Sequence, residues 1–293
     1  MKTIIISAAD EKFSGLLIDL INSLFQWEKP LSDAIGILDL GLSKKTKNSI
    51  KDKVTHFVVP GWDLPIDSSI KAKRAFERAK LSRPFLPRYF PGYDLYLWLD
   101  ADSWIQERFV IDYFFKAAKN GELAICESAD RCFNYSKETL KWRENYLFEY
   151  FGDEGLKLYR WAMLHISRHL YYNNGAFCLE KNAPHWNSWA KYFKQGLERY
   201  PFGVSDQATL NFAIWKDNLK VYPLPSSCNW ACHLALPILN QRTGKLVEPL
   251  IPHRPIGLIH MTAHTKDFLI KQKSPLKGYT LRYLSAFKST LNN

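Results

Sequence analysis

The chain has 293 residues, of which 46% are hydrophobic and 24% charged, a composition that excludes a disordered chain and supplies enough apolar material for a sizeable core. Lys and Arg number 40 against 29 Asp and Glu, and the formal net charge of +11 favours an anionic partner such as nucleotide phosphates, nucleic acid or an acidic membrane surface. The five cysteines are odd in number and include no C-x-x-C pair, which argues against a disulfide framework and for a reducing compartment.

The apolar segments are too short for membrane insertion. The run within residues 1–7 is shorter than the apolar part of a signal peptide, and no later segment approaches the roughly 20 apolar residues of a membrane span. We therefore expect a cytoplasmic protein. Its basic surface also allows peripheral contact with the anionic inner face of a membrane.

The first half of the chain alternates between strand and helix patterns, which predicts a parallel sheet with helices on both faces. The predicted strands of this half are 3–7, 34–40, 56–59, 94–99 and 122–126, and the predicted helices are 13–25, 43–53, 70–81 and 107–119. The second half is less regular. Its predicted helices are 136–151, 153–169, 183–198 and 205–217, its predicted strands are 175–180, 219–222 and 256–260, and residues 223–255 form a Pro-rich loop.

Two carboxylates follow the apolar strand predicted at 94–99. Asp100 and Asp102 flank Ala101, and residues i and i+2 of an extended segment face the same side. An unpaired buried carboxylate is costly, and the carboxyl ends of parallel strands are where open α/β sheets bind their ligands. A divalent cation that carries a phosphorylated ligand would compensate both acids. The alternative is an acidic turn ahead of the helix at 107–119.

Another group of candidate ligands follows the strand predicted at 256–260. His260 ends that apolar run, and a neutral imidazole there could complete the metal site, although a purely structural histidine fits the position as well. Lys266 lies in a loop-like stretch and could neutralise a phosphate as a point charge. His264 is the competing metal ligand.

Polar residues elsewhere offer further contacts. Lys80 and Arg83 could bind phosphate or sugar, although the many basic residues around them are equally typical of a solvated surface. The segment 172–175, Tyr-Asn-Asn-Gly, carries amides that can bind sugar hydroxyls and a glycine that permits close backbone approach, or it is simply a turn. Ser205 fits the N-cap of the helix at 205–217, which leaves the amide of Gln207 without a structural explanation.

In chain order these segments resemble the GT-A glycosyltransferases, and most of all glycosyltransferase family 8, the galactosyltransferase and glycogenin-like group. In the family's last motif, H-x-x-G-x-x-K, this chain has Ala263 in place of the glycine, and Asp267-Phe268 follows the lysine in place of the usual Pro-Trp. The resemblance spans residues 3–268 and rests on Ile6-Ser-Ala-Ala9-Asp10, Lys80…Arg83…Leu86-Pro87, Leu97-Trp-Leu-Asp100-Ala-Asp102, Asn173-Asn174-Gly175, Asp206-Gln207-Ala-Thr-Leu210-Asn211, Leu224-Pro225…Asn229-Trp230, and His260 with Lys266.

The resemblance implies an α/β protein with the GT-A fold, in which a mostly parallel central sheet is flanked by helices. It implies transfer of a sugar from a nucleotide-sugar, a UDP-sugar in this family, to a glycan, glycolipid or other hydroxyl acceptor, with retention of the anomeric configuration. Gln207 would lie near the reacting carbon, with Asp206 keeping a double-displacement route open. By the same resemblance, Mn²⁺ or Mg²⁺ would be bound by Asp100, Asp102 and His260, and the donor by Ala8, Ala9, Asp10, Lys80, Arg83, Asp100, Ala101, Asn173 and Lys266.

We expect a single domain over residues 1–293. Residues 1–130 would form its nucleotide- and metal-binding half, residues 131–268 an acceptor-side half with a helical, aromatic-rich insertion, and residues 269–293 a basic C-terminal helix. Glu127 and Asp130 are both candidates for the acid that follows the fifth strand, and the sequence does not choose between them.

Two other functions fit parts of the sequence. A sugar nucleotidyltransferase has a similar fold, but its Gly-rich phosphate loop is missing from residues 7–13. A non-catalytic basic protein could use the segments Lys44–Lys53 and Lys266–Lys288 to bind nucleic acid or an anionic membrane. We expect no nucleic acid as a partner; the basic surface would instead dock a transferase on a membrane that carries a lipid-linked acceptor.

Overall fold

The computed structural model describes residues 1–165, 171–263 and 265, and these are built around a seven-stranded sheet. All neighbouring strands are parallel except β7, which is antiparallel to β4 and β6. The predicted α/β architecture with a mostly parallel sheet is therefore confirmed. In spatial order the strands are β3 (His56–Val58), β2 (Ala34–Asp39), β1 (Thr3–Ala9), β4 (Leu95–Leu99), β7 (Tyr172–Glu180), β6 (Leu123–Glu127) and β8 (Val221–Leu224).

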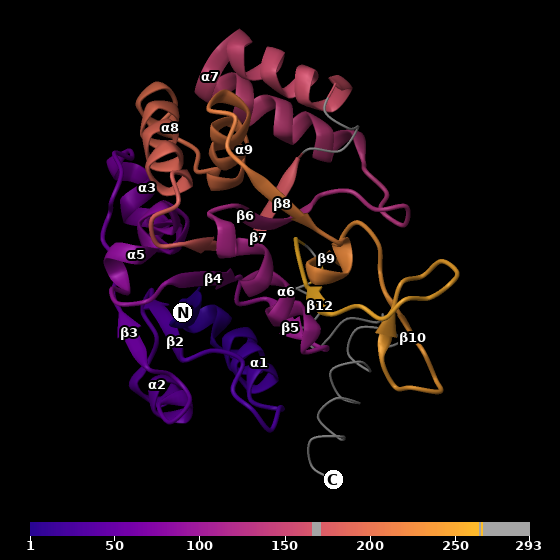
Figure 1. Cartoon of the computed structure of the whole chain (residues 1–293). Helices are drawn as coiled ribbons and strands as arrows, with labels where there is room; N and C mark the ends of the chain where they lie inside the picture. Colours follow the sequence, from indigo (N-terminus) through magenta and orange to yellow (C-terminus); the bar gives the residue numbers. More distant parts are fainter. Residues whose placement is uncertain (166–170, 264, 266–293) are drawn as a thin grey trace.

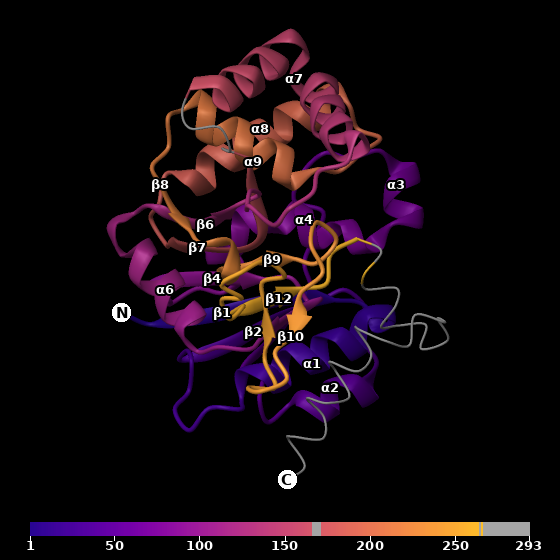
Figure 2. The same ribbon diagram turned by 90° about the vertical axis from the view of Figure 1, so that its right-hand side faces the viewer.

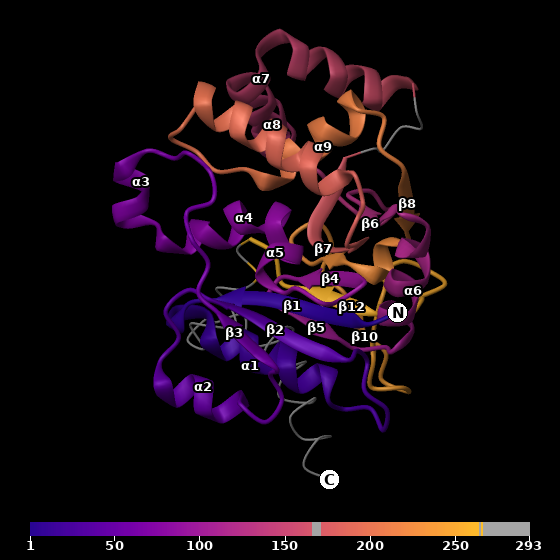
Figure 3. The same ribbon diagram turned by 60° about the vertical axis from the view of Figure 1, so that its left-hand side comes forward.

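The two faces of the sheet carry separate apolar cores. Successive side chains of a strand point to opposite faces, so Ile4 and Ile6 of β1 join one core and Ile5 joins the other. Helices cover both faces, as the alternating pattern predicts (Figures 1 and 3). On the face of Ile5 these are α1 (Ser14–Leu24), α2 (Lys44–Ile50) and α6 (Phe109–Ala117), and on the face of Ile4 they are α7 (Lys137–His165), α8 (His185–Arg199) and α9 (Asp206–Lys216).

Most predicted elements correspond to an observed one, but the single helix at 70–81 is wrong. The backbone leaves the helical region at Arg74 (φ −132°, ψ 53°). Beside this break Glu77 is buried, with Arg74 and Lys80, three residues before and after it, as its ion-pair partners. The spacing of apolar residues could not reveal the burial of an acid. The segment forms α3 (Ser68–Lys73), a 3₁₀ turn (Ala75–Glu77) and α4 (Arg78–Ser82), followed by a 3₁₀ turn (Arg83–Phe85) and α5 (Leu86–Tyr89).

The predicted break between two helices at 151 and 153 is confirmed, because Gly152 inside α7 has non-helical dihedrals (φ 61°, ψ −144°). A left-handed φ of this kind favours glycine. The end of the helix predicted to reach residue 169 and the basic helix predicted at 269–293 lie outside the described residues.

The Pro-rich segment predicted as a loop contributes one short strand, β9 (Trp230–Ala231), to a second, smaller sheet. Strand β12 (Leu258–His260) lies between β5 (Ser103–Ile105) and β9 (Trp230–Ala231). Figure 2 shows this sheet in the middle of the molecule, between helices α7–α9 and helices α1 and α2. The remaining short strands, β10 (Ile238–Leu239) and β11 (Leu246–Val247), form a hairpin.

A buried histidine gives the fold a pH dependence that can be measured. His185 is fully buried at the start of α8, its Nε2 donates to the Lys220 carbonyl at 2.9 Å, and its Nδ1 has no hydrogen-bond partner among the described residues. Burial lowers the pKa of His185 to about 4.

As the pH falls from about 6.5 to about 4, the unfolded chain binds a proton at His185 that the folded chain excludes, so this residue should reduce the free energy of unfolding by about 3 kcal/mol. Urea unfolding at pH 7 and pH 4 should show a smaller acid-induced loss for His185→Gln than for the wild type. Equal losses in the two proteins would contradict the prediction.

Candidate metal and substrate site

The two carboxylates predicted to bind a metal lie on the tight turn that joins β4 to β5. Asp100 N donates to the Gly175 carbonyl at 2.8 Å, which anchors the turn to the start of β7. Because β7 runs antiparallel to β4, the beginning of β7 lies beside the end of β4, with Ala176 opposite Leu99. The segment 172–175 is thereby placed at the same edge of the sheet as the carboxylates.

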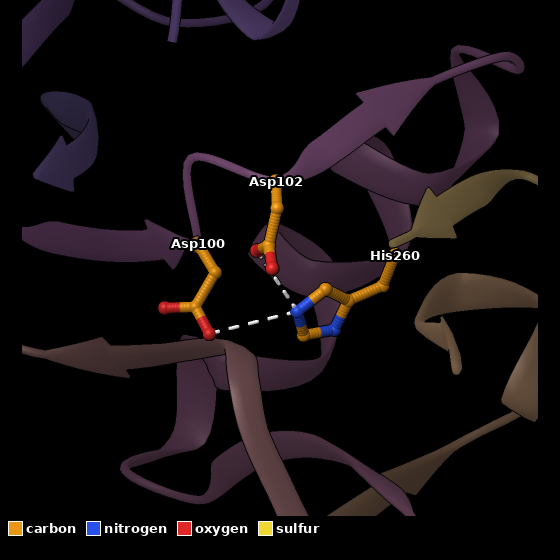
Figure 4. A group of neighbouring side chains, drawn as sticks. All are labelled: Asp100, Asp102 and His260. Carbon is orange, nitrogen blue, oxygen red and sulfur yellow. Dashed lines mark ion pairs between the residues drawn. The ribbon is translucent and has the colours of Figure 1, made fainter. Parts of the chain in front are cut away.

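His260 joins the carboxylates through the smaller sheet. Strand β12 pairs antiparallel with β5 and places His260 opposite Ser103, one residue after Asp102. The His260 Nε2 lies 3.2 Å from Asp102 Oδ1 and 3.6 Å from Asp100 Oδ2 (Figure 4). One potential ligand atom from each residue lies within 4.8 Å of the other two, so the three residues predicted as metal ligands are brought together.

A hydrogen bond sets the orientation of the imidazole. His260 Nδ1 lies 2.8 Å from Asn229 Oδ1, and the Asn229 amide nitrogen donates to the Asn173 carbonyl at 3.4 Å, which assigns the oxygen of Asn229 to the histidine side. In a neutral imidazole, an acceptor at Nδ1 selects the tautomer with its proton there, and the Nε2 lone pair then faces the carboxylates. A lone pair aimed at two acids is unfavourable without a cation between them, so the donor set fits a divalent metal.

The two oxygens of Asp100 have different surroundings. Oδ1 accepts hydrogen bonds from Arg83 and from Trp98 Nε1, whereas Oδ2 is the oxygen nearest His260. Burial raises the pKa of the Asp100 carboxyl, the Arg83 guanidinium opposes this rise, and repulsion from Asp102 adds to it. A bound cation would favour the ionised carboxylate in the same way that Arg83 does.

Arg83 links the carboxylate turn to the start of α9. It is buried, its Nη1 lies 2.6 Å from Asp206 Oδ2, and its Nη2 pairs with Asp100. Asn174 Nδ2 donates to the same Asp206 oxygen at 2.8 Å, and the guanidinium lies 4.5 Å from the centre of the Trp98 ring. The role of Ser205 as the N-cap of α9 is confirmed by its bond from Ala208 N.

The carboxylates and His260 open onto a pocket of about 480 Å³. Polar side chains from several elements face this pocket. Gln207 is the one glutamine among the described residues that line it. The lining residues are Asp100, Asp102, Ser128, Glu138, Thr139, Trp142, Arg143, Asn173, Asn174, Gln207, His233, Leu234, His260, Thr262 and Ala263.

The remaining predicted donor contacts that the structure describes are not among the residues that line this pocket. Ala8 and Ala9 end β1, whose register places Ile6 opposite Trp98, so this strand end lies beside the carboxylate turn that contains Ala101. Asp10 caps the 3₁₀ turn that follows, accepting from Phe13 N. Lys80 forms an ion pair with Glu77 and reaches the Val204 carbonyl, and neither it nor Asp206 lines the pocket. Lys266 and the alternative ligand His264 lie outside the described residues.

Neither candidate for the acid after the fifth predicted strand lines the pocket, although Ser128 between them does. Glu127 ends β6 opposite Tyr172. Asp130 accepts from Cys132 N at 2.8 Å and from Ser226 Oγ, so it joins two loops.

The sequence did not identify several residues that shape the site. Asn229 appeared only as part of a motif, and its contact with His260 depends on the pairing of β9 with β12, which a Pro-rich segment does not reveal. Asn174 lines the pocket together with the predicted Asn173, and it also donates to Asp206. The α7 residues Trp142 and Arg143 lie on the pocket wall, and the high aromatic content of that segment was their only signal.

A side chain at position 175 would collide with His260 and lie close to Asp100, two of the candidate metal ligands. A Cβ built on Gly175 would lie 2.1 Å from His260 Cε1 and 3.0 Å from Asp100 Oδ2. Gly175→Ala should therefore displace the imidazole and weaken Mn²⁺ binding at least about tenfold, measured by calorimetry. Gly15→Ala, where a Cβ meets nothing within 4 Å, is the matched control. Unchanged Mn²⁺ affinity in Gly175→Ala would contradict this geometry.

Comparison with solved structures identifies the fold. The galactosyltransferase LgtC, in complex with donor and acceptor sugar analogues, superposes with a TM-score of 0.54 at 14% sequence identity, over 97% of this chain and 99% of that one. The chain has the GT-A fold. Mouse xyloside xylosyltransferase 1 gives a TM-score of 0.51 at 10% identity over 90% and 98% of the two chains. The glycosyltransferase GlyE of Streptococcus pneumoniae TIGR4 gives 0.51 at 14% identity, over 99% of this chain and 64% of its own.

The similarity to GT-A proteins is seen in the structure and not in the sequence comparisons. No protein-family profile matches the sequence, and no curated protein sequence matches it. Within the described residues, no helix has both the length and the apolar character needed to cross a bilayer.

Proposed function

We propose that this protein is a metal-dependent glycosyltransferase that uses a nucleotide-sugar donor. The observation that carries the proposal is the convergence of Asp100, Asp102 and His260 in the lining of a pocket that is also lined by amides. Two carboxylates and an oriented imidazole suit Mn²⁺ or Mg²⁺, and such a cation binds the diphosphate of a nucleotide. The GT-A fold, shared with LgtC and xyloside xylosyltransferase 1, supports the same reaction class.

The residues of the site have different roles in binding the donor. A cation held by Asp100, Asp102 and His260 supplies a Lewis acid that stabilises negative charge on the leaving nucleotide. Arg83 holds Asp100 and Asp206 in fixed positions, and Asn229 holds the imidazole. The end of β1, from Ala8 to Asp10, would contact the nucleotide.

Gln207 is the member of the Asp206-Gln207 pair that would meet the sugar, because it faces the pocket while Asp206 is turned toward Arg83. Retention of configuration is part of the proposal, with the Gln207 amide at the reacting carbon, while Asp206 is paired with Arg83 and Asn174. A glutamine is also an active-site residue in LgtC, for which a solved glutamine-to-glutamate active-site mutant aligns with 97% of this chain at a TM-score of 0.51. UDP is the proposed nucleotide, and Lys266 the proposed partner of its phosphates.

Screening nucleotide-sugars for slow hydrolysis tests this function without knowledge of the acceptor. With Mn²⁺ present, at least one UDP-sugar should be hydrolysed, and chelation of the metal should abolish the reaction. Hydrolysis that is insensitive to chelation would contradict the metal role. A complete absence of hydrolysis and of nucleotide binding across UDP-, GDP- and CDP-sugars would contradict the function itself.

A further inference from the structure

The wall of the pocket contributed by α7 differs from the metal-binding wall. It comes from the first turns of the helix, which belong to the second half of the chain, and it consists of Glu138, Thr139, Trp142 and Arg143. Two of these side chains have contrasting exposures. Arg143 is buried, with 6% of its surface exposed, whereas Trp142 is 43% exposed.

The buried guanidinium of Arg143 lies among aromatic rings. Its central carbon is 4.3 Å from the centre of the Tyr171 ring and 4.8 Å from that of Tyr135. Burial raises the pKa of the Tyr135, Tyr159 and Tyr171 phenols, so these hydroxyls stay neutral and do not cancel the positive charge. Among residues 1–165, 171–263 and 265, no carboxylate forms an ion pair with Arg143.

A buried cation without a counterion is expensive, and contact with aromatic faces offsets only part of its desolvation. The one acid of this wall, Glu138, is exposed, and hydrogen bonds from its own backbone N–H and from Ser136 lower its pKa. It therefore stays ionised at the start of α7 and is screened by solvent. An anion entering the pocket would supply the negative counterion that the Arg143 guanidinium lacks. The guanidinium can donate two parallel hydrogen bonds to a carboxylate or a phosphate.

Trp142 offers the complementary surface for a sugar ring. Its indole is partly exposed at the pocket and is held edge-on by Tyr146, with ring centres 5.2 Å apart. A fixed, exposed aromatic face next to a buried guanidinium provides an apolar platform and a charged contact side by side.

We propose that the sugar bound against α7 is acidic, with its ring stacked on Trp142 and its carboxylate or phosphate paired with Arg143. The inference deepens the proposed glycosyltransferase function and rests on it. The charged sugar can be either the transferred sugar or the acceptor, and the experiment separates the two.

The experiment uses the full chain with Mg²⁺ and measures two sets of affinities by calorimetry and saturation-transfer NMR. In the donor arm, UDP-glucuronate is compared with UDP-glucose. In the acceptor arm, with UDP bound, glucuronate, galacturonate, N-acetylneuraminate and glucose 6-phosphate are compared with glucose, galactose and N-acetylglucosamine. In one arm the acidic ligand should bind at least about tenfold more tightly than its neutral counterpart.

Substitutions in the α7 wall test whether its residues cause the tighter binding of the acidic ligand. Arg143→Gln should abolish it without weakening the neutral ligand, and Arg143→Lys should keep part of it. Arg160→Gln, an exposed arginine on the same helix, should leave it unchanged. Trp142→Ala should weaken the acidic sugar more than Trp161→Ala, which removes a ring of equal exposure, 43%, from outside the pocket lining.

No preference for any acidic ligand in the wild type would overturn the inference, whether or not Arg143→Gln folds. A preference that survives in a folded Arg143→Gln variant would overturn it as well. Failure of UDP to bind with either Mg²⁺ or Mn²⁺ is a separate result, because it removes the proposed function. The free acidic and neutral sugars can then be compared without UDP in the wild type and in Arg143→Gln, so the charge preference is still tested.

Discussion

Asp102→Asn should lower metal-dependent hydrolysis of the donor by about a thousandfold, which corresponds to several kcal/mol of lost transition-state stabilisation. The substitution keeps the size of the side chain but removes one of the two negative charges that face His260 Nε2. The backbone carbonyl of residue 102, which accepts from Met261 N at 2.9 Å, remains available, so the turn should persist. Initial rates over a range of Mn²⁺ concentrations measure the effect.

The control for this variant is Asp112→Asn, which removes a carboxylate with 58% of its side chain exposed on the outside of α6. It should hydrolyse the donor at the wild-type rate. If Asp102→Asn, folded and saturated with Mn²⁺, turns over within a few fold of the wild type, Asp102 is not a metal ligand.

Arg83→Met should destabilise the metal-free protein by about 3–5 kcal/mol. The guanidinium lies between Asp100 and Asp206, whose side chains are 25% and 7% exposed, so its removal leaves two poorly solvated carboxylates without their counterion. Urea unfolding in the presence of a chelator measures the loss. Mn²⁺ should restore part of it, because the cation compensates Asp100 and not Asp206.

An exposed ion pair provides the comparison for Arg83. Lys194 and Glu198 on α8 lie 3.7 Å apart with side chains 61% and 57% exposed, so Lys194→Gln should cost less than about 1 kcal/mol. A similarly small loss in Arg83→Met would mean that Asp100 and Asp206 are well solvated or neutral without Arg83.

The sheet and its helices could be predicted because their signals are local. Alternating short apolar runs and amphipathic segments specify β1 to β4 and the helices that connect them, and Gly152 marks the break in α7. The single helix at 70–81 was wrong because the backbone breaks at Arg74 beside the buried acid Glu77, and a pattern of apolar residues does not predict the burial of an acid.

The candidate metal ligands could be proposed because Asp100 and Asp102 follow a predicted strand and His260 ends one, but their convergence depends on pairing that the sequence does not encode locally. His260 reaches Asp102 only because β12 pairs with β5, and the segment 172–175 reaches Asp100 only because β7 runs antiparallel. Arg143 and Trp142 were missed because a helix pattern does not show which face lines a pocket.

Binding of UDP with and without Mn²⁺ tests the central claim most directly, because it requires neither the correct sugar nor the acceptor. Calorimetry should show binding to the wild type with Mn²⁺ and none with a chelator, and a strong loss of the Mn²⁺-dependent binding in Asp102→Asn. UDP affinity that is the same with Mn²⁺ and with a chelator would contradict the assignment of Asp100, Asp102 and His260 as the site that holds the cation and, through it, the nucleotide diphosphate.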